Sequence, residues 1–248
     1  MNILIGHTGF VGSNLCKDMA FDLLINSKNI NDIVNIECES IVFCGMPAEK
    51  WKINQNSEID DVNTQNLINI LRTVKCKSFT LISTIDIYDN PIECDENTIQ
   101  DIPSHAYGKN RFLFEQFIST YFNHQIIRLP GLFGSGLKKN IIYDLMNDNN
   151  IHLINSNNAF QWYPISHLNK DLQILKEHPN IKLINFGTEP ISTSELVNEC
   201  FPNQRLTEFE FGNVKYNMKT KYASIFGSTG DYILNKNQII NELKEYIK

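Results

Sequence analysis

The stretch that decides the fold reads Met1-Asn2-Ile3-Leu4-Ile5-Gly6-His7-Thr8-Gly9-Phe10-Val11-Gly12. Its apolar run, Ile3 to Ile5, is typical of a strand buried on both faces of a parallel sheet. Three glycines follow at a spacing of three, and residues 13–16 continue as a helix. Because the N-terminus of a helix offers free N–H groups and the positive end of its dipole, this order predicts an anion site.

Glycine suits such a turn because it permits the tight bend and lets the backbone approach a pyrophosphate closely. The alternative is a plain strand-to-helix turn that binds nothing. We favour the dinucleotide site, since the glycines lie directly between a strand and a helix. The turn residues expected to contact the cofactor are Gly6, Thr8, Gly9, Phe10, Val11 and Gly12.

Size and charge narrow the class of protein. The 248 residues suffice for one α/β domain with a smaller lobe, and the formal net charge is −6. No block of Lys and Arg is present, which argues against nucleic acid or an anionic membrane as the main partner. The six cysteines form no C-x-x-C pair, so we expect reduced cytoplasmic thiols and no metal site. Met1 leads directly into a strand, so no signal peptide is expected.

The rest of the chain alternates apolar runs with helical patterns, which indicates an α/β fold with a Rossmann-like, doubly wound parallel sheet. Residues 30–36, which join the second expected strand to the next one, are expected to form one short helical segment. A helix is expected over 60–71, with an apolar stripe formed by Val62, Leu67, Ile70 and Leu71. Ser192, with Glu195 three residues later, predicts a helix start. Further strands are expected over 21–25, 41–44, 79–82, 125–129 and 181–186, and further helices over 105–122, 141–146, 167–175, 192–200 and 237–247.

The second strand ends in Asn26-Ser27-Lys28 and carries no acid that could hold a ribose 2′-hydroxyl. Ser27 and Lys28 could instead receive a 2′-phosphate, so we favour NADP over NAD. An ordinary polar turn explains these residues equally well.

The phrase GHTGFVGSNL, residues 6–15, resembles a signature of the extended short-chain dehydrogenase/reductase family, of the NAD-dependent epimerase/dehydratase type. The resemblance is clear over residues 1–135. It implies an NAD(P)-dependent oxidoreductase or epimerase acting on a sugar or nucleotide-sugar. It also implies cofactor contacts at Cys44, Gly45, Met46, Asn63, Ile82, Ser83, Leu129 and Pro130.

Three further positions match the catalytic pattern of that family. Thr84 stands four residues before Tyr88, and Tyr107 occupies the tyrosine of Y-x-x-x-K, but Arg111 replaces the lysine. A free tyrosine has a pKa of about 10, and a neighbouring cation favours its phenolate. The resemblance therefore implies Tyr107 as acid/base, with Thr84 and Arg111 beside it. Arginine is not a conservative replacement at such a site, which keeps open a catalytically idle NAD(P)-binding sensor or scaffold.

Expected substrate contacts are Asp86 at the end of a strand and Lys138, Lys139 and Asn140 in the later part of the chain. Two lysines after a loop are more often a solvated face, and His105 is more typical of an exposed loop. We expect a cofactor domain over 1–135 with 181–187 as a returning strand. The substrate lobe is expected over 136–180 and 188–248. A homodimer is compatible with this organisation, and the partner implied is a small molecule.

Overall fold

The computed structural model describes residues 1–206, 209 and 212–248 of the chain. The chain divides into two compact units. The first comprises Met1–Asn90, Thr98–Arg128 and Leu175–Ile184, and the second comprises Pro91–Asn97, Leu129–Ile174 and Asn185–Lys248. The first unit thus includes residues 175–180, which we had expected in the lobe, and the second includes 91–97 and 129–135, which we had expected in the cofactor domain.

The first unit is built on a six-stranded sheet, and β1 pairs in parallel with β2 on one side and β3 on the other. In register, Ile5 lies between Ile25 and Phe43, so these strands end together at one edge. The prediction of a Rossmann-like parallel sheet is confirmed. Across the sheet the strands are β10 (Leu183–Asn185), β6 (His124–Leu129), β4 (Lys75–Thr84), β3 (Glu37–Phe43), β1 (Asn2–Ile5) and β2 (Leu23–Ile25).

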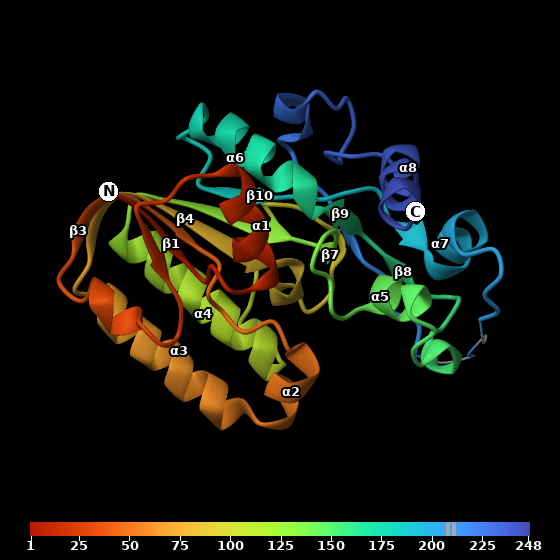
Figure 1. Ribbon diagram of the computed structural model, residues 1–248, viewed down its shortest axis with the longest axis horizontal. Coiled ribbons are helices and arrows are strands. Elements are labelled where there is room, and N and C mark those ends of the chain that lie inside the picture. The colour runs from red at the N-terminus through yellow and green to blue at the C-terminus, as the bar shows by residue number, and fades with distance from the viewer. Residues whose placement is uncertain (207–208, 210–211) are drawn as a thin grey trace. The chain divides into compact units, whose positions relative to one another are not determined.

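Helices cover both faces of this sheet, with α3 and α4 along one face and α1 on the other (Figure 1). An aromatic core joins the sheet to α4, where the ring of Phe43 lies 6.1 Å from that of Phe79 and 5.0 Å from that of Phe114. Burying such rings supplies much of the stabilisation of a core. The helices are α1 (Phe10–Asp18), α2 (Lys50–Gln55), α3 (Ser57–Leu71) and α4 (Ala106–Tyr121), with short 3₁₀ turns η1 (Ile30–Ile33) and η2 (Ile85–Ile87).

Three expectations about this unit need correction. The segment expected to be helical over 30–36 is only the short turn η1, and α2 was not expected at all. The predicted apolar stripe of α3 is correct for Leu71, Leu67 and Ile70, which lie in or against the core, but Val62 is 59% exposed, whereas Asp60 and Thr64 are buried. Hydrophobic periodicity misses the position of Asp60 because this acid occupies a core position, where Arg111 neutralises its charge.

The second unit packs helices around a separate apolar core that includes Phe133, Trp162 and Leu243. As predicted, Ser192 caps α7 by accepting a hydrogen bond from the N–H of Glu195 at 3.2 Å. Its elements are β5 (Ile92–Cys94), β7 (Gly131–Phe133), α5 (Ile141–Met146), η3 (Ile151–Leu153), β8 (Ala159–Phe160), β9 (Trp162–Pro164), η4 (Ile165–His167), α6 (Leu168–Lys176, whose last two residues belong to the first unit), β11 (Ile191–Ser192), α7 (Thr193–Cys200), β12 (Asn217–Met218), η5 (Ala223–Phe226) and α8 (Lys236–Tyr246).

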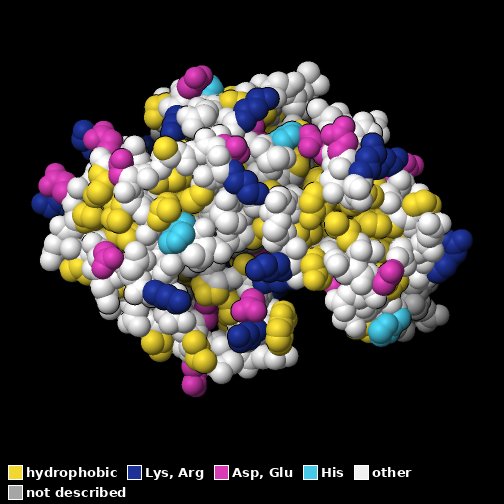
Figure 2. All heavy atoms as spheres, viewed as in Figure 1, with side chains coloured by type: hydrophobic (Ala, Val, Ile, Leu, Met, Phe, Trp, Pro, Cys, Tyr) yellow, Lys and Arg dark blue, Asp and Glu magenta, His cyan; other side chains and the backbone are white. Residues whose placement is uncertain are grey.

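Surface charge is mixed rather than one-signed on the face drawn in Figure 2, where Lys and Arg side chains alternate with Asp and Glu. Among the helices described, none is both long and apolar enough to cross a membrane. Within residues 1–206, 209 and 212–248, no group of three or more His, Cys, Asp and Glu side chains is arranged to hold a metal ion.

Candidate functional site

The glycine turn lies between β1 and α1, and its glycines have different physical tasks. Gly6 takes a φ of +97°, and a Cβ on Gly12 would lie 2.2 Å from the carbonyl oxygen of Gly6. The fold itself therefore requires both. A Cβ on Gly9 would meet nothing closer than 3.4 Å, so the internal packing leaves this position open. Gly9 is the N-cap of α1 and provides no side-chain cap, while Thr8 beside it is exposed. The start of α1 is therefore open and has no side-chain cap, and an uncapped helix N-terminus suits an anion.

The end of β2 lies beside this turn, because the N–H of Gly6 donates to the carbonyl of Ile25 at 2.8 Å. The amide oxygen of Asn26 accepts from the N–H of Lys28 at 2.8 Å and closes a tight turn. Ser27 and Lys28 are exposed on that turn. The turn that carries Ser27 and Lys28 therefore follows directly on the residue that contacts the glycine turn.

The end of β3 lies on the other side of the turn. The Cys44 thiol donates to the carbonyl of Ile5 at 3.3 Å, and burial raises the pKa of this thiol to about 12. Cys44 is therefore an unreactive packing residue at neutral pH. Gly45 follows it, and Met46 packs partly buried against the core of the first unit.

Thr84 and Tyr107 meet where β4 ends and α4 begins. Thr84 is near enough to the Tyr107 phenol to act on its pKa, and it caps η2 by accepting from the N–H of Asp86 at 3.1 Å. The Nδ1 atom of His105 accepts from the N–H of Gly108 at 3.0 Å, so His105 caps α4 and is not the exposed loop residue that we expected. Local capping therefore fixes both ends of the Thr84–Tyr107 contact.

Arg111 lies one turn after Tyr107 on α4, and its guanidinium carbon stacks 4.0 Å from the centroid of the Tyr107 ring. The guanidinium also donates to Asp60 of α3 at 2.5 Å and to the carbonyl of Pro47. Arg111 and Asp60 are 4% and 3% exposed, and Asn110 donates to the same carboxylate oxygen at 2.7 Å. The Nε of Arg111 is buried and has no hydrogen-bond partner among the residues that the structure describes.

The surroundings of Tyr107 raise its pKa above the usual value for tyrosine. Burial of the phenol is the largest cause, and the carboxylate of Asp86 adds to it. Arg111 and then Thr84 act in the opposite direction but do not outweigh burial. Tyr107 is therefore a protonated donor at neutral pH.

Asp86, the expected substrate contact, lies close to this pair. Its carboxylate accepts from the ammonium of Lys50 at 2.7 Å, which ties α2 to the end of β4. A second tie between α2 and α4 runs from the N–H of Tyr107 to the amide oxygen of Asn54 at 2.9 Å. The pKa of His105 nearby is lowered, mainly by burial and then by the charge of Lys50.

A buried polar network that we did not expect lies behind Thr84. Glu115 of α4 pairs with Arg128 of β6 at 2.7 Å and accepts from the hydroxyl of Ser83 at 2.5 Å. Arg128 also donates to the hydroxyl of Tyr88 at 2.7 Å. Ser83, expected at the cofactor, is thus bonded to Glu115. The sequence contains a signal for this network, because Arg128 stands inside the apolar run of β6 and a charge at such a position requires a buried partner.

The other expected cofactor contacts of the first unit are distributed as follows. Ile82 is buried in β4 at 8% exposure, and Phe10 and Val11 are half-buried in the first turn of α1. Asn63 is exposed on α3. The structure therefore does not gather Asn63 into the polar group around Tyr107, which draws on Asp60 from this helix instead.

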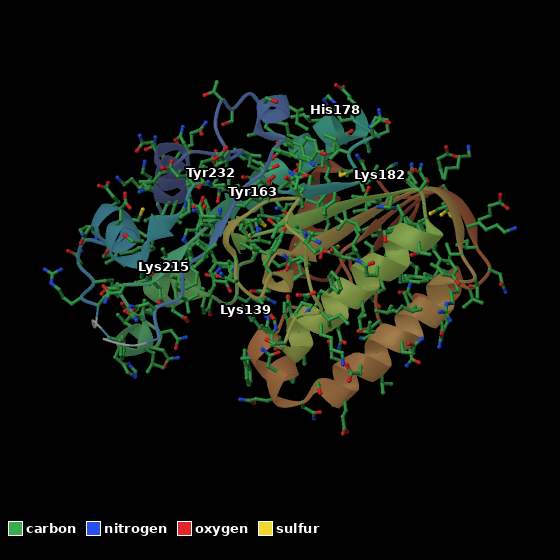
Figure 3. The ribbon with its side chains drawn as sticks, turned by 180° about the vertical axis from the view of Figure 1, so that it is seen from behind. Lys139, Tyr163, His178, Lys182, Lys215 and Tyr232 are labelled. Atoms are coloured by element: carbon green, nitrogen blue, oxygen red, sulfur yellow. The ribbon has the colours of Figure 1, made fainter. Side chains whose placement is uncertain are left out.

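Five expected contacts belong to the second unit. Asn140 caps α5: its amide oxygen accepts from the N–H of Ile142 at 3.0 Å, and its amide nitrogen donates to the carbonyl of Leu132 at 2.8 Å. This gives the amide a structural task that our expectation of a substrate contact did not include. Lys138 and Lys139 are exposed, and Lys139 is labelled in Figure 3. Leu129 is the last residue of β6, Pro130 follows it, and both are buried.

Scans against family models and curated sequences give no match. Solved structures do match over nearly the whole chain. A dTDP-4-dehydrorhamnose reductase from Clostridium acetobutylicum ATCC 824 has a TM-score of 0.75 at 18% identity, with 100% of this chain and 98% of that chain covered. A UDP-glucuronic acid 4-epimerase from Bacillus cereus, in complex with UDP-glucuronic acid and NAD, has a TM-score of 0.74 at 16% identity, covering 100% and 99%. A dTDP-4-dehydrorhamnose reductase from Bacillus anthracis str. Ames, in complex with NADP, has a TM-score of 0.74 at 14% identity, covering 99% and 96%. At these identities the likeness establishes the fold.

Proposed function

We propose that this chain is an NAD(P)-dependent oxidoreductase or epimerase that acts on a sugar or nucleotide-sugar. The observation that carries the proposal is the stacking of Arg111 on the phenol ring of Tyr107, with Thr84 close enough to the phenol to act on its pKa. Tyr107 holds the proton that a substrate oxygen gains or loses, and Thr84 donates a hydrogen bond to the same oxygen. The likeness to reductases and epimerases of nucleotide-sugars supports this class of substrate.

The glycine turn is the proposed cofactor site. Gly9 leaves the start of α1 open to a pyrophosphate, and Ser27 and Lys28 lie on the neighbouring turn, where a 2′-phosphate would be received. A bound nicotinamide supplies or accepts the hydride. Among the similar structures, one was solved with NAD and another with NADP, and the exposed Lys28 leads us to favour NADP.

The test is an assay of cofactor oxidation and reduction with a panel of nucleotide-sugars and their 4-keto derivatives. Tyr107→Phe removes the hydroxyl and should abolish turnover while cofactor affinity stays within about twofold, because only a transition-state proton transfer is lost. Tyr121→Phe is the matched control, since Tyr121 is 53% exposed on the same helix. Identical behaviour of wild type and Tyr107→Phe toward every substrate would refute the enzymatic role.

A second candidate is a dinucleotide-binding sensor or scaffold without turnover. The pairing of Arg111 with Asp60 favours it, because this cation is engaged by a buried carboxylate instead of standing free as a catalytic lysine would. Cofactor binding by calorimetry together with no turnover on the panel would identify this candidate.

A further inference from the structure

We infer that Asp60 is a positioning residue that neutralises Arg111 beneath Tyr107, so that Tyr107 serves as a proton donor and the site works as a reductase of a keto-sugar. This inference rests on the proposed function and adds the direction of its reaction. It also assigns a role to a residue that lies outside the catalytic pattern of the sequence.

The geometry of the ion pair is the first step. A free cation next to a phenol favours the phenolate, which is the form that removes a proton from an alcohol. Here the guanidinium of Arg111 lies 2.5 Å from a carboxylate oxygen of Asp60, and both side chains are almost fully buried. The pair has no net charge, and Arg111 reaches Tyr107 over the ring face, 4.0 Å from its centroid. Arg111 still lowers the pKa of Tyr107, but burial outweighs it, and the pairing with Asp60 leaves a weaker pull toward the phenolate than a free cation would exert.

The second step is the charge on the other side of the phenol. From the end of β4, the carboxylate of Asp86 opposes a phenolate, and Lys50 of α2 balances part of that charge at 2.7 Å. His105, at the start of α4, has a pKa below the usual value for histidine and stays neutral. Arg111 is paired with Asp60 and Lys50 with Asp86, and burial raises the pKa of Tyr107 enough to outweigh Arg111.

The reaction that suits this site is the reduction of a carbonyl. A dihydronicotinamide held at the glycine turn would supply the hydride to the carbonyl carbon as the C=O π bond breaks. Tyr107 gives its proton to the carbonyl oxygen, so that an alcohol forms, and its phenolate then takes a proton from water. Thr84 orients the carbonyl by a hydrogen bond. The reverse reaction needs the phenolate first and is slow at neutral pH.

The protonation of Tyr107 can be measured without turnover. Absorbance at the tyrosinate band, near 295 nm, is followed during a pH titration of wild type and of Tyr107→Phe. The difference between them isolates one tyrosine out of nine. We expect no difference up to about pH 9. A tyrosinate present only in the wild type, with a midpoint near neutrality, would overturn the inference even if the chain is an enzyme.

Kinetics test the role of Asp60. Reduction should be nearly independent of pH between about 6 and 9, whereas alcohol oxidation should rise about tenfold per pH unit as the phenolate forms. Asp60→Asn leaves Arg111 unbalanced and should raise oxidation at neutral pH about tenfold or more. Asp61→Asn, at an exposed neighbouring position, is the control and should change neither profile.

The outcomes separate the two proposals. Oxidation by the wild type that is already independent of pH at neutrality would overturn the inference but keep the enzyme. Absence of turnover in both directions would overturn the proposed function, and the tyrosinate titration would still report the state of Tyr107. If Asp60→Asn fails to fold, as circular dichroism would show, the wild-type titration and pH profiles can still overturn the inference, because a tyrosinate near neutrality contradicts it.

Discussion

Replacing Gly9 by valine should abolish cofactor binding and leave the fold intact, whereas Gly12→Ala should damage the fold. At Gly9 the backbone has φ −77° and ψ 172°, which valine adopts readily, and an added Cβ meets nothing closer than 3.4 Å. The cost is that of exchanging the N-cap residue, about 1 kcal/mol. At Gly12 an added Cβ would lie 2.2 Å from a carbonyl oxygen, so the backbone must move. Overpacking of this kind costs about 3 kcal/mol or more.

Thermal unfolding with and without NADPH measures these free-energy costs as changes in Tm. For a chain of 248 residues, 1 kcal/mol corresponds to roughly 2–4 °C in Tm. Without cofactor, Gly9→Val should lose at most about 4 °C and Gly12→Ala about 6 °C or more. At about 100 times its Kd, the cofactor stabilises wild type by about 2.7 kcal/mol, which is roughly 5–10 °C.

The same cofactor concentration should leave the Tm of Gly9→Val unchanged, because the valine occupies the space of the pyrophosphate. Calorimetry with NADPH provides the independent measurement of affinity. Two results would refute this reasoning. One is a thermal shift of wild-type size in Gly9→Val, which would show that the ligand does not approach this glycine. The other is wild-type stability of Gly12→Ala, which would show that the turn is less tightly closed than the structure indicates.

Three further predictions concern other parts of the first unit. Tyr107→Phe should abolish the rise of alcohol oxidation with pH as well as turnover, whereas Tyr121→Phe should preserve both in steady-state assays. Lys28→Ala should weaken NADPH about tenfold and NADH little by calorimetry, because only a 2′-phosphate requires the cation; an equal loss for both would make Lys28 an ordinary turn residue. Glu115→Gln leaves Arg128 buried without its anion and should lower the free energy of unfolding in urea by about 3–5 kcal/mol; a loss below about 1 kcal/mol would contradict a structural role for the pair.

Local patterns in the sequence determined the parts of this protein that depend on neighbouring residues. The apolar run before Gly6 and the glycines after it specify a strand, a turn and a helix start, and all three are present. The cap at Ser192 was predicted for the same reason, since its hydrogen bond spans only three residues. The spacing of Tyr107 and Arg111 places them on one helix face, and the stacked pair follows from it.

Tertiary structure alone decided the polar contacts that set the chemistry. Asp60 is 51 residues from Arg111 in the sequence, and only the packing of α3 against α4 brings their charges to 2.5 Å. Asp60 was left out of the predicted buried face of α3 for the same reason: periodicity treats an acid as a surface residue, but a neutralised acid can occupy the core. Ser83 likewise finds Glu115 across 32 residues. Such pairings depend on which elements become neighbours, and a single sequence read through local propensity and periodicity does not specify that.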